Sequence, residues 1–290
     1  MAKRCFLIVN PTAGRFSRQK IEQVISILQQ YGFDTELLLT AKADDATIFA
    51  RRICAEEAEP FIVAGGGDGT VNDVVNSLLP GRATLGLLPF GTANVLASEL
   101  NISSMEKAMQ RLVRGETRQL SAGMLEWQGK RKYFLLMVGI GLDGAVVEEV
   151  RLPEKKIIGK GAYILSALRQ LTAWNQELFT IRADGIDMEC HSAVICNGRK
   201  YGGDFVMAAS ADIFSPGFHV LCVKDAKRRS YVKLVFGMLA GRLPQDGSVA
   251  MFPARVLEIS GSKAVQVDGD YYCHAPVRIT AVENFARIIS

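Results

Sequence analysis

The chain lacks any hydrophobic run that approaches the ~18 apolar residues of a membrane-spanning helix. Its six cysteines are scattered, without a Cys-x-x-Cys pair and without a histidine at zinc-binding spacing. This pattern is typical of reduced thiols and argues against a disulfide framework or a zinc site. The apolar stretch at 5–9 is too short for the core of a signal peptide. We therefore expect a cytoplasmic protein that associates with a membrane only transiently, at its surface.

Net charge is also low, at +4 from 34 basic and 30 acidic residues. Residues 1–120 hold 13 of each sign, so the excess lies in the rest of the chain, with basic clusters at 130–132, 155–160 and 227–229. A basic residue near anionic lipid contributes ~1 kcal/mol of attraction. These clusters are therefore candidates for peripheral membrane contact, and they are equally typical of solvated hairpin ends. The small excess and the absence of interleaved aromatic residues argue against nucleic-acid binding.

Glycine is concentrated at residues 65–70, which read Gly-Gly-Gly-Asp-Gly-Thr, between the apolar run 61–64 and the amphipathic stretch 71–79. A strand that ends in glycines and leads into a helix suits phosphate, because backbone N–H groups are free there and the helix dipole favours negative charge. Asp68 would repel phosphate unless a divalent cation lay between them. The hexapeptide therefore indicates a metal–nucleotide site, with a ligand-free glycine turn as the alternative.

Two further junctions have the same character. Residues 89–97 follow the apolar run 84–88 and open a short helix, and residues 10–14 follow the run 6–9. Loops of this kind on one parallel sheet lie together at its carboxyl edge, where α/β proteins bind ligands. Three such loops favour a binding site over simple turns.

With these motifs the chain resembles the diacylglycerol kinase catalytic-domain family, bacterial lipid kinases related to diacylglycerol, sphingosine and ceramide kinases. The resemblance rests on Asn10-Pro11, on the motifs at 65–73 and 89–97, on Gly-Ile-Gly-Leu-Asp-Gly at 139–144, on 197–203 and on Val-Asp-Gly-Asp at 267–270. The order is that of the family along nearly the whole chain. Gly-Gly-Asp-Gly-Thr is shared with NAD kinases and phosphofructokinases, whereas Gly-Thr-x-Asn about twenty residues later resembles the lipid branch.

The resemblance implies an ATP- and Mg²⁺-dependent kinase that phosphorylates a lipid hydroxyl at a membrane surface, and a homodimer is one assembly we consider. Asp68 would organise the metal–nucleotide complex, Asp246 is a weaker candidate for a structural metal, and Asp143 would line the substrate cleft. Contacts to ATP are expected from Asn10, Gly14, Thr40, Gly65, Gly66, Gly67, Asp68, Gly69, Thr70, Asn72, Thr92 and Asn94. Thr70 is also expected to cap the helix that follows.

Transfer to an alcohol needs a general base, and the resemblance assigns that role to Asp270. The family carries glutamate at this position, so Asp270 is shorter by one methylene. The family usually carries glutamate in place of Asp73 and aspartate in place of Ser121, and that aspartate belongs to its carboxylate–water–magnesium network. The absence of that aspartate at Ser121 puts the network and the rate in question.

Two alternatives stay open. An NAD kinase shares Gly-Gly-Asp-Gly-Thr and a two-domain layout, and a catalytically weak nucleotide- or lipid-binding regulator would fit Ser121 and Asp270. The spacing at 139–144 also matches the dinucleotide-binding Gly-x-Gly-x-x-Gly. We do not adopt that interpretation, because the second strand and acidic residue it requires are replaced by a helical pattern at 161–166.

The pattern of elements predicts two domains. Residues 1–120 alternate strand and helix, which indicates an α/β domain with a mainly parallel sheet and helices on both faces. Ser103 and Glu106 read as a capping box that opens its last helix. Residues 121–280 read as a mostly antiparallel β-sandwich-like domain with hairpins at 128–129 and 184–185 and helices at 161–172 and 230–241. The resemblance implies an NAD kinase/diacylglycerol kinase-like fold in which residues 281–290 return to the first domain.

Overall fold

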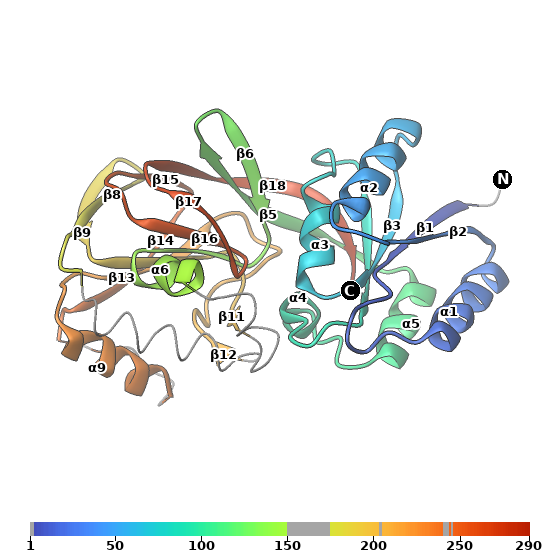
Figure 1. The fold of residues 1–290 in the computed structure, drawn as a ribbon, viewed down its shortest axis with the longest axis horizontal. Coiled ribbons are helices and arrows are strands. Elements are labelled where there is room, and N and C mark those ends of the chain that lie inside the picture. Colours follow the sequence, from blue (N-terminus) through green and yellow to red (C-terminus); the bar gives the residue numbers. More distant parts are fainter. Residues whose placement is uncertain (1–2, 150–174, 203–204, 240–243, 245) are drawn as a thin grey trace.

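The computed structural model describes residues 3–149, 175–202, 205–239, 244 and 246–290. The helix expected at 161–172 lies outside the described residues. Two lobes are arranged along the long axis of the molecule, an α/β lobe and a β-rich lobe (Figure 1). This is the predicted fold class.

The first domain is built on four parallel strands in the order β2-β1-β3-β4. Its strands β3 and β4 are almost wholly buried, as expected for a parallel sheet covered on both faces. Helices α2 and α3 contact each other on one face, and α1 and α5 contact each other on the other (Figure 1). In chain order the elements are β1 Lys3–Val9, α1 Arg18–Gln30, β2 Phe33–Leu39, α2 Asp45–Glu56, β3 Phe61–Gly66, α3 Asp68–Val75, β4 Thr84–Pro89, α4 Val95–Glu99 and α5 Met105–Arg114.

The second domain packs two sheets face to face. One is antiparallel, in the order β14-β13-β10-β7-β16-β17, and the other continues the sheet of the first domain through β18, β15, β8 and β9. Their facing side chains form a shared core that includes Phe134, Val220 and Ile279. The elements are β5 Thr117–Trp127, β6 Lys130–Phe134, β7 Met137–Ile140, α6 Leu142–Glu149, β8 Phe179–Ala183, β9 Ile186–Cys190, β10 Ser192–Cys196, β11 Lys200–Tyr201, β12 Phe205–Val206, β13 Phe218–Val223, α9 Arg228–Leu239, β14 Val249–Ala254, β15 Val256–Ile259, β16 Ala264–Val267, β17 Asp270–His274 and β18 Val277–Ile289.

Both predicted hairpins are present. Gln128 and Gly129 have φ of 48° and 75°, and Asp184 and Gly185 have φ of 46° and 90°. Positive φ at both central residues is the type I′ geometry that matches the twist of the flanking strands. The local signals at these turns were sufficient to predict the hairpins.

Strand β18 joins the domains. It pairs with β15 where it begins and with β5 along most of its length, and its last residues pair in parallel with β4 through Arg287 and Ile288. Residue 280 therefore lies inside β18, and residue 120 lies inside β5. The two domains share a continuous sheet across both of these positions.

Several helix ends differ from the prediction. Ser104 rather than Ser103 is the N-cap of α5, and its hydroxyl accepts the N–H of Lys107. Helix α3 begins at Asp68 with Gly67 at the N-cap, so Thr70 lies inside the first turn and does not cap it. The short helix that residues 89–97 were expected to open begins at Val95. Each error is local, because neighbouring polar residues compete for the same cap.

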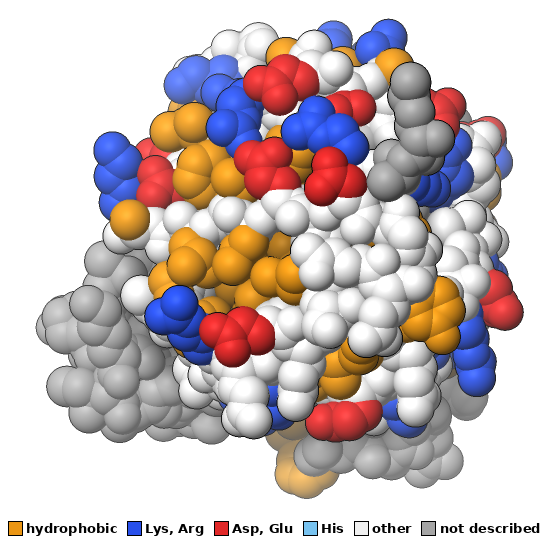
Figure 2. All heavy atoms as spheres, turned by 90° about the vertical axis from the view of Figure 1, so that its right-hand side faces the viewer, with side chains coloured by type: hydrophobic (Ala, Val, Ile, Leu, Met, Phe, Trp, Pro, Cys, Tyr) orange, Lys and Arg blue, Asp and Glu red, His pale blue; other side chains and the backbone are white. Residues whose placement is uncertain are grey.

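The outer end of the first domain mixes basic and acidic side chains around a small apolar area (Figure 2). Exposed apolar residues of this domain include Tyr31 and Ile48. Among the described helices, none combines the length and the apolar character needed to cross a bilayer.

Candidate active site

The three glycine-containing loops meet at the carboxyl ends of β1, β3 and β4. The N–H groups of Phe90 and Gly91 both donate to the carbonyl of Gly66 at 3.0 Å, and the N–H of Asn10 donates to the carbonyl of Gly65 at 2.8 Å. A Cβ atom on Gly91 would lie 2.4 Å from the Cα of Gly67, so only glycine allows this approach. The loops therefore form a single surface, as expected from their positions in the sheet.

The other predicted nucleotide contacts surround this surface. Thr40 follows β2, and its N–H donates to the carbonyl of Val9 at 2.9 Å. A Cβ on Gly14 would lie 3.7 Å from the Thr92 hydroxyl. Gly69 faces open space, because a Cβ there would meet no atom within 4 Å. Thr70 and Asn72 are buried residues of α3, so their side chains pack inside the protein.

Asp68 has a structural partner in addition to its predicted role. Its Oδ1 accepts the N–H of Leu96 at 3.3 Å, in the first turn of α4. The residue at the N-cap of α4, Asn94, makes no side-chain capping bond, so Asp68 serves as the cap from 28 residues away. Burial raises the pKa of Asp68, and the N–H groups of Leu96 and its neighbours act in the opposite direction.

Sequence reasoning gave no separate role to Asp268. Its carboxylate accepts the N–H groups of Leu135, Leu136 and Met137 at 2.9, 3.0 and 2.8 Å. The pKa of Asp268 is raised to about 6, chiefly by burial and also by the charge of Asp68, against the lowering effect of these bonds. Asp268 thus clamps the β16–β17 turn to the segment between β6 and β7. Its pKa also responds to the charge of Asp68 in the loop 65–70 of the first domain.

Asp270 is exposed at the start of β17. Its charge acts on Asp73 of α3: burial raises the pKa of Asp73, Lys132 lowers it, and Asp44 and Asp270 raise it. Carboxylates of the two domains therefore interact in two pairs, Asp68 with Asp268 and Asp73 with Asp270. So much negative charge at the boundary between domains favours a cationic ligand.

Within the described ranges, no three histidine, cysteine or acidic side chains converge to hold a metal ion by themselves. In nucleotide complexes Mg²⁺ takes one or two protein carboxylates and completes its shell with phosphates and water. Asp246 has other partners: it accepts from Lys233 Nζ and the Ser248 hydroxyl, both at 2.5 Å, and these contacts lower its pKa. Its geometry is that of an ion pair.

Asp143 lies in α6, inside the second domain. It accepts the Tyr201 hydroxyl and the Nε2 of Gln266, the latter at 2.8 Å. Burial raises its pKa, and both hydrogen bonds oppose that effect. Gln266 in turn accepts the N–H of Gly269 at 2.7 Å. Asp143 is therefore linked to the Asp268–Asp270 turn through one side chain.

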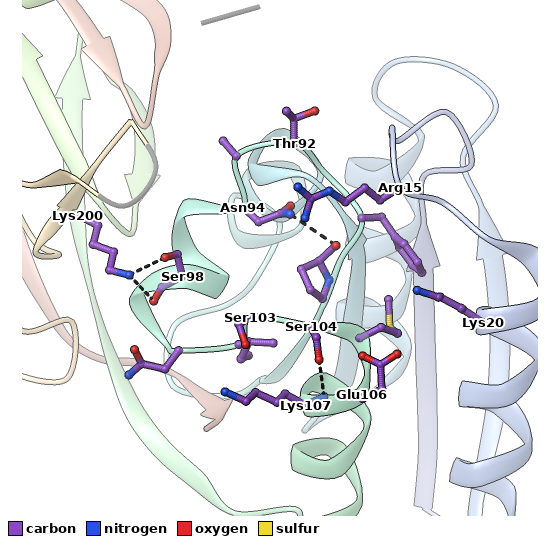
Figure 3. A pocket seen from close by; sticks show the side chains of 16 residues that line it. Arg15, Lys20, Thr92, Asn94, Ser98, Ser103, Ser104, Glu106, Lys107 and Lys200 are labelled. Carbon is purple, nitrogen blue, oxygen red and sulfur yellow. Dashed lines mark hydrogen bonds between the residues drawn. The ribbon is translucent and has the colours of Figure 1, made fainter.

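A cavity of about 610 Å³ borders the Thr92–Asn94 loop and extends toward α5 (Figure 3). The exposed side chains of Arg15, Lys20 and Lys107 line it. The ammonium of Lys200, also in its lining, donates to the Ser98 hydroxyl at 2.6 Å. The basic side chains that line this cavity place positive charge beside the glycine-containing loops.

Two family models match the chain. The diacylglycerol kinase catalytic domain matches residues 4–125, and the YegS C-terminal NAD kinase beta sandwich-like domain matches residues 136–290. The chain belongs to the diacylglycerol kinase catalytic-domain family. This lipid kinase is thus a phosphotransferase, and the family predicted from the motifs is confirmed.

Named relatives cover almost the whole kinase. A diacylglycerol kinase of Bacillus subtilis (strain 168) is 29% identical over 278 residues, which are 93% of this chain and 90% of that protein. One of Staphylococcus aureus (strain JH9) is 26% identical over 293 residues, covering 98% and 91%. A crystal structure of a diacylglycerol kinase from Bacillus anthracis (strain Sterne) has a TM-score of 0.80 at 24% identity, covering 99% of this chain and 96% of that one. This last likeness confirms the fold.

The double role of Asp68 can be separated by substitution. Asp68→Asn keeps an oxygen for the N–H of Leu96 but removes the charge, so we expect the kinase to stay folded and to lose ~100-fold or more in turnover. Asp68→Ala also removes the cap of α4 and should cost a further ~1 kcal/mol of unfolding free energy. Urea denaturation and a turnover assay measure the two effects. Parent-like turnover in folded Asp68→Asn would contradict an electrostatic role.

The Asp268 clamp should be essential to stability as well as to activity. Asp268→Asn replaces one acceptor oxygen by a donor facing backbone N–H groups, which should lower the unfolding free energy by ~1–3 kcal/mol. Asp184 provides a matched control, since it precedes glycine in another hairpin and accepts the N–H of Val256 at 2.8 Å. Asp184→Asn should lower stability but leave turnover of the folded protein unchanged. Equal losses of turnover in the two variants would show that Asp268 acts only through folding.

Proposed function

We propose that this lipid kinase transfers the γ-phosphoryl group of ATP, with Mg²⁺, to the hydroxyl of a diacylglycerol-like lipid. The observation that carries the proposal is the electrostatic effect of Asp68 on Asp268, and of Asp270 on Asp73, across the boundary between the domains. The names of the relatives supply the lipid class.

The nucleotide phosphates belong at the loop 65–70. The first N–H groups of α3 have no partner within the helix, and Gly69 faces open space, so a phosphate can approach the backbone closely. Arg15 and Lys20 add positive charge on the side of the Thr92 loop. These features support a polyphosphate ligand over a neutral one.

Asp68 is the first-domain carboxylate that would hold Mg²⁺ together with the phosphates, and Asp73 lies further along the same helix. When bound, the ion neutralises charge on the phosphates during transfer. Burial raises the pKa of Asp68, and burial together with the charges of Asp44 and Asp270 raises that of Asp73. A cation beside them would lower these pKa values and keep both groups ionised.

Asp270 is suited to act as the base, because it is exposed at the end of a clamped turn that faces the first domain. In the transfer step the lipid hydroxyl oxygen bonds to the γ-phosphorus while the bond from that phosphorus to the β,γ-bridging oxygen breaks. The hydroxyl proton passes to the Asp270 carboxylate, and ADP leaves with the electron pair of the broken bond. The side chain is one methylene shorter than the glutamate of the family pattern, and the acceptor has to approach correspondingly closer.

The acceptor lipid is expected in a membrane, so contact with the bilayer is part of the proposal. The exposed basic residues at 227–229 support it. Whether the kinase works as a monomer or as a homodimer does not alter the site, since all four carboxylates come from one chain.

The substrate class can be tested with γ-labelled ATP and a panel of acceptors: diacylglycerol, phosphatidylglycerol, a sphingoid base, a polyprenol and NAD. We expect Mg²⁺-dependent label in diacylglycerol. Label in NAD alone would identify an NAD kinase, and label in no acceptor despite ATP binding would identify a regulator. Either outcome would overturn the proposal.

The role of Asp270 can be tested in the same assay. Asp270→Asn keeps the size but removes the proton acceptor, so turnover should fall ~10²–10⁴-fold with little change in ATP binding. Asp270→Glu keeps the carboxylate and should remain active. Asp187→Asn, which removes an exposed charge at β9, is the control and should behave like the parent. If Asp270→Asn turned over normally, Asp270 would be a turn residue only.

A further inference from the structure

Helix α9 has an apolar face that points away from the protein. Its inner face packs through Leu234 and Tyr231 on Leu221, Val223 and Val249. On the other side Val232, Val235 and Phe236 are 53%, 55% and 68% exposed. Spacings of three and four place these residues in one stripe. Nothing among the described residues covers them.

Basic side chains surround this stripe. Lys224, Lys227, Arg228, Arg229 and Lys233 are all exposed, from the residues before α9 to its middle. Two acids lie among them: Asp225 pairs with Lys227 at 3.7 Å, and Asp246 pairs with Lys233 at 2.5 Å. The described part of this surface therefore has three more cations than anions. An exposed apolar stripe with basic flanks is the pattern of helices that lie in a membrane interface.

The short β11–β12 hairpin lies on the same lower side of the second domain as α9 in the view of Figure 1, and it carries two more exposed apolar residues. Phe205 and Val206 are 38% and 50% exposed. The same hairpin holds Tyr201, whose hydroxyl is bonded to Asp143. The hairpin is thereby linked through Tyr201 to Asp143, which lies behind the Asp268–Asp270 turn.

We propose that α9 and β12 form the membrane-docking surface of this lipid kinase, with Phe236, Val232 and Val235 inserted among the headgroups of an anionic bilayer. The proposal rests on the proposed function, because that function places the acceptor in a bilayer. A protein partner fits less well: three exposed side chains on one helix fall short of the ~800 Å² per partner of a stable interface, and the excess of one charge sign suits anionic lipid.

Vesicle sedimentation without ATP tests the docking surface. The parent should bind phosphatidylcholine vesicles that contain phosphatidylglycerol, weakly bind phosphatidylcholine alone, and dissociate as salt is raised. Val232→Ser/Phe236→Ser and Arg229→Glu should each weaken binding to the anionic vesicles ~10-fold or more. Ile48→Ser, at an equally exposed apolar residue of the first domain, is the control and should bind like the parent.

Turnover on a short-chain, water-soluble diacylglycerol separates docking from catalysis. The α9 variants should retain parent turnover there and lose it on long-chain diacylglycerol in vesicles. Parent-like vesicle binding by the double serine variant would overturn the docking proposal, as would a shift from dimer to monomer in that variant with vesicle binding unchanged. Absence of turnover in the parent on every lipid would overturn the proposed function, while the vesicle result would still stand.

A separate observation carries a second inference, on Asp143 and Gln266. Gln266 is 1% exposed, and both polar atoms of its amide are hydrogen-bonded. Nε2 donates to Asp143, and Oε1 accepts the N–H of Gly269. Asp143, which accepts the Tyr201 hydroxyl, is a carboxylate and can only accept hydrogen bonds. The donor Nε2 of Gln266 therefore faces Asp143, and the acceptor Oε1 faces the turn. The turn that carries Asp270 is thereby held by a second contact in addition to the Asp268 clamp.

We infer that Asp143 and Gln266 are positioning residues that orient Asp270 without contacting the substrates. Exchanging their functional groups tests this. Gln266→Glu alone places two carboxylates together, and Asp143→Asn alone leaves its amide facing the amide of Gln266. In the double variant, the amide introduced at position 143 can accept from Tyr201 and donate to the carboxylate introduced at position 266. That carboxylate still accepts from Gly269, so every bond is restored, with the bond between the two side chains reversed in polarity.

We expect each single variant to lower kcat ~10-fold or more while the KM for ATP stays constant, and the double variant to recover kcat to within a few-fold of the parent. Measurements are made per folded protein, with thermal unfolding as the check. Single variants with parent kcat would overturn the inference. So would a double variant no better than the worse single, since that result means the Asp143 charge itself acts on the substrate.

Discussion

Strand β18 couples the two domains mechanically, and the geometry of the site depends on it. Its start pairs with β15 in the sandwich, its length pairs with β5, and its end adds to the parallel sheet beside β4. Because backbone hydrogen bonds run across the boundary, the domains cannot separate without breaking a sheet. The three glycine-containing loops of the first domain are therefore held in a defined orientation relative to the β16–β17 turn of the second.

Within this arrangement, three carboxylates of the candidate active site have different roles. Asp268 clamps the turn through three backbone N–H groups, Asp68 caps α4, and Asp270 is left exposed at the end of the clamped turn. Burial raises the pKa values of Asp68 and Asp268, and the charge of Asp68 contributes to the raised pKa of Asp268. The negative charge of these carboxylates is unfavourable without a cation to neutralise it. We therefore expect a metal–nucleotide complex as the ligand of this site.

Local signals predicted much of this. The loop 65–70 and both type I′ hairpins were visible from glycine, the polar residue that precedes it and the flanking apolar runs, because a few neighbouring residues determine them. The contacts of Asp268 with Leu135–Met137 join residues more than 130 positions apart, and no period or motif reports such a pairing. The cap that Asp68 provides for α4 is non-local for the same reason. The outer stripe of α9 was hidden because apolar residues on a helix normally indicate burial.

The central claim is that acidic residues from the two domains act on one phosphoryl transfer. A double-mutant cycle on turnover with Asp68→Asn and Asp270→Asn tests it most directly, because residues that act as a unit are strongly non-additive. If both residues act on one step, we expect the double variant to be no more than a few-fold slower than the slower single variant. Losses that multiply, as for independent sites, would contradict it.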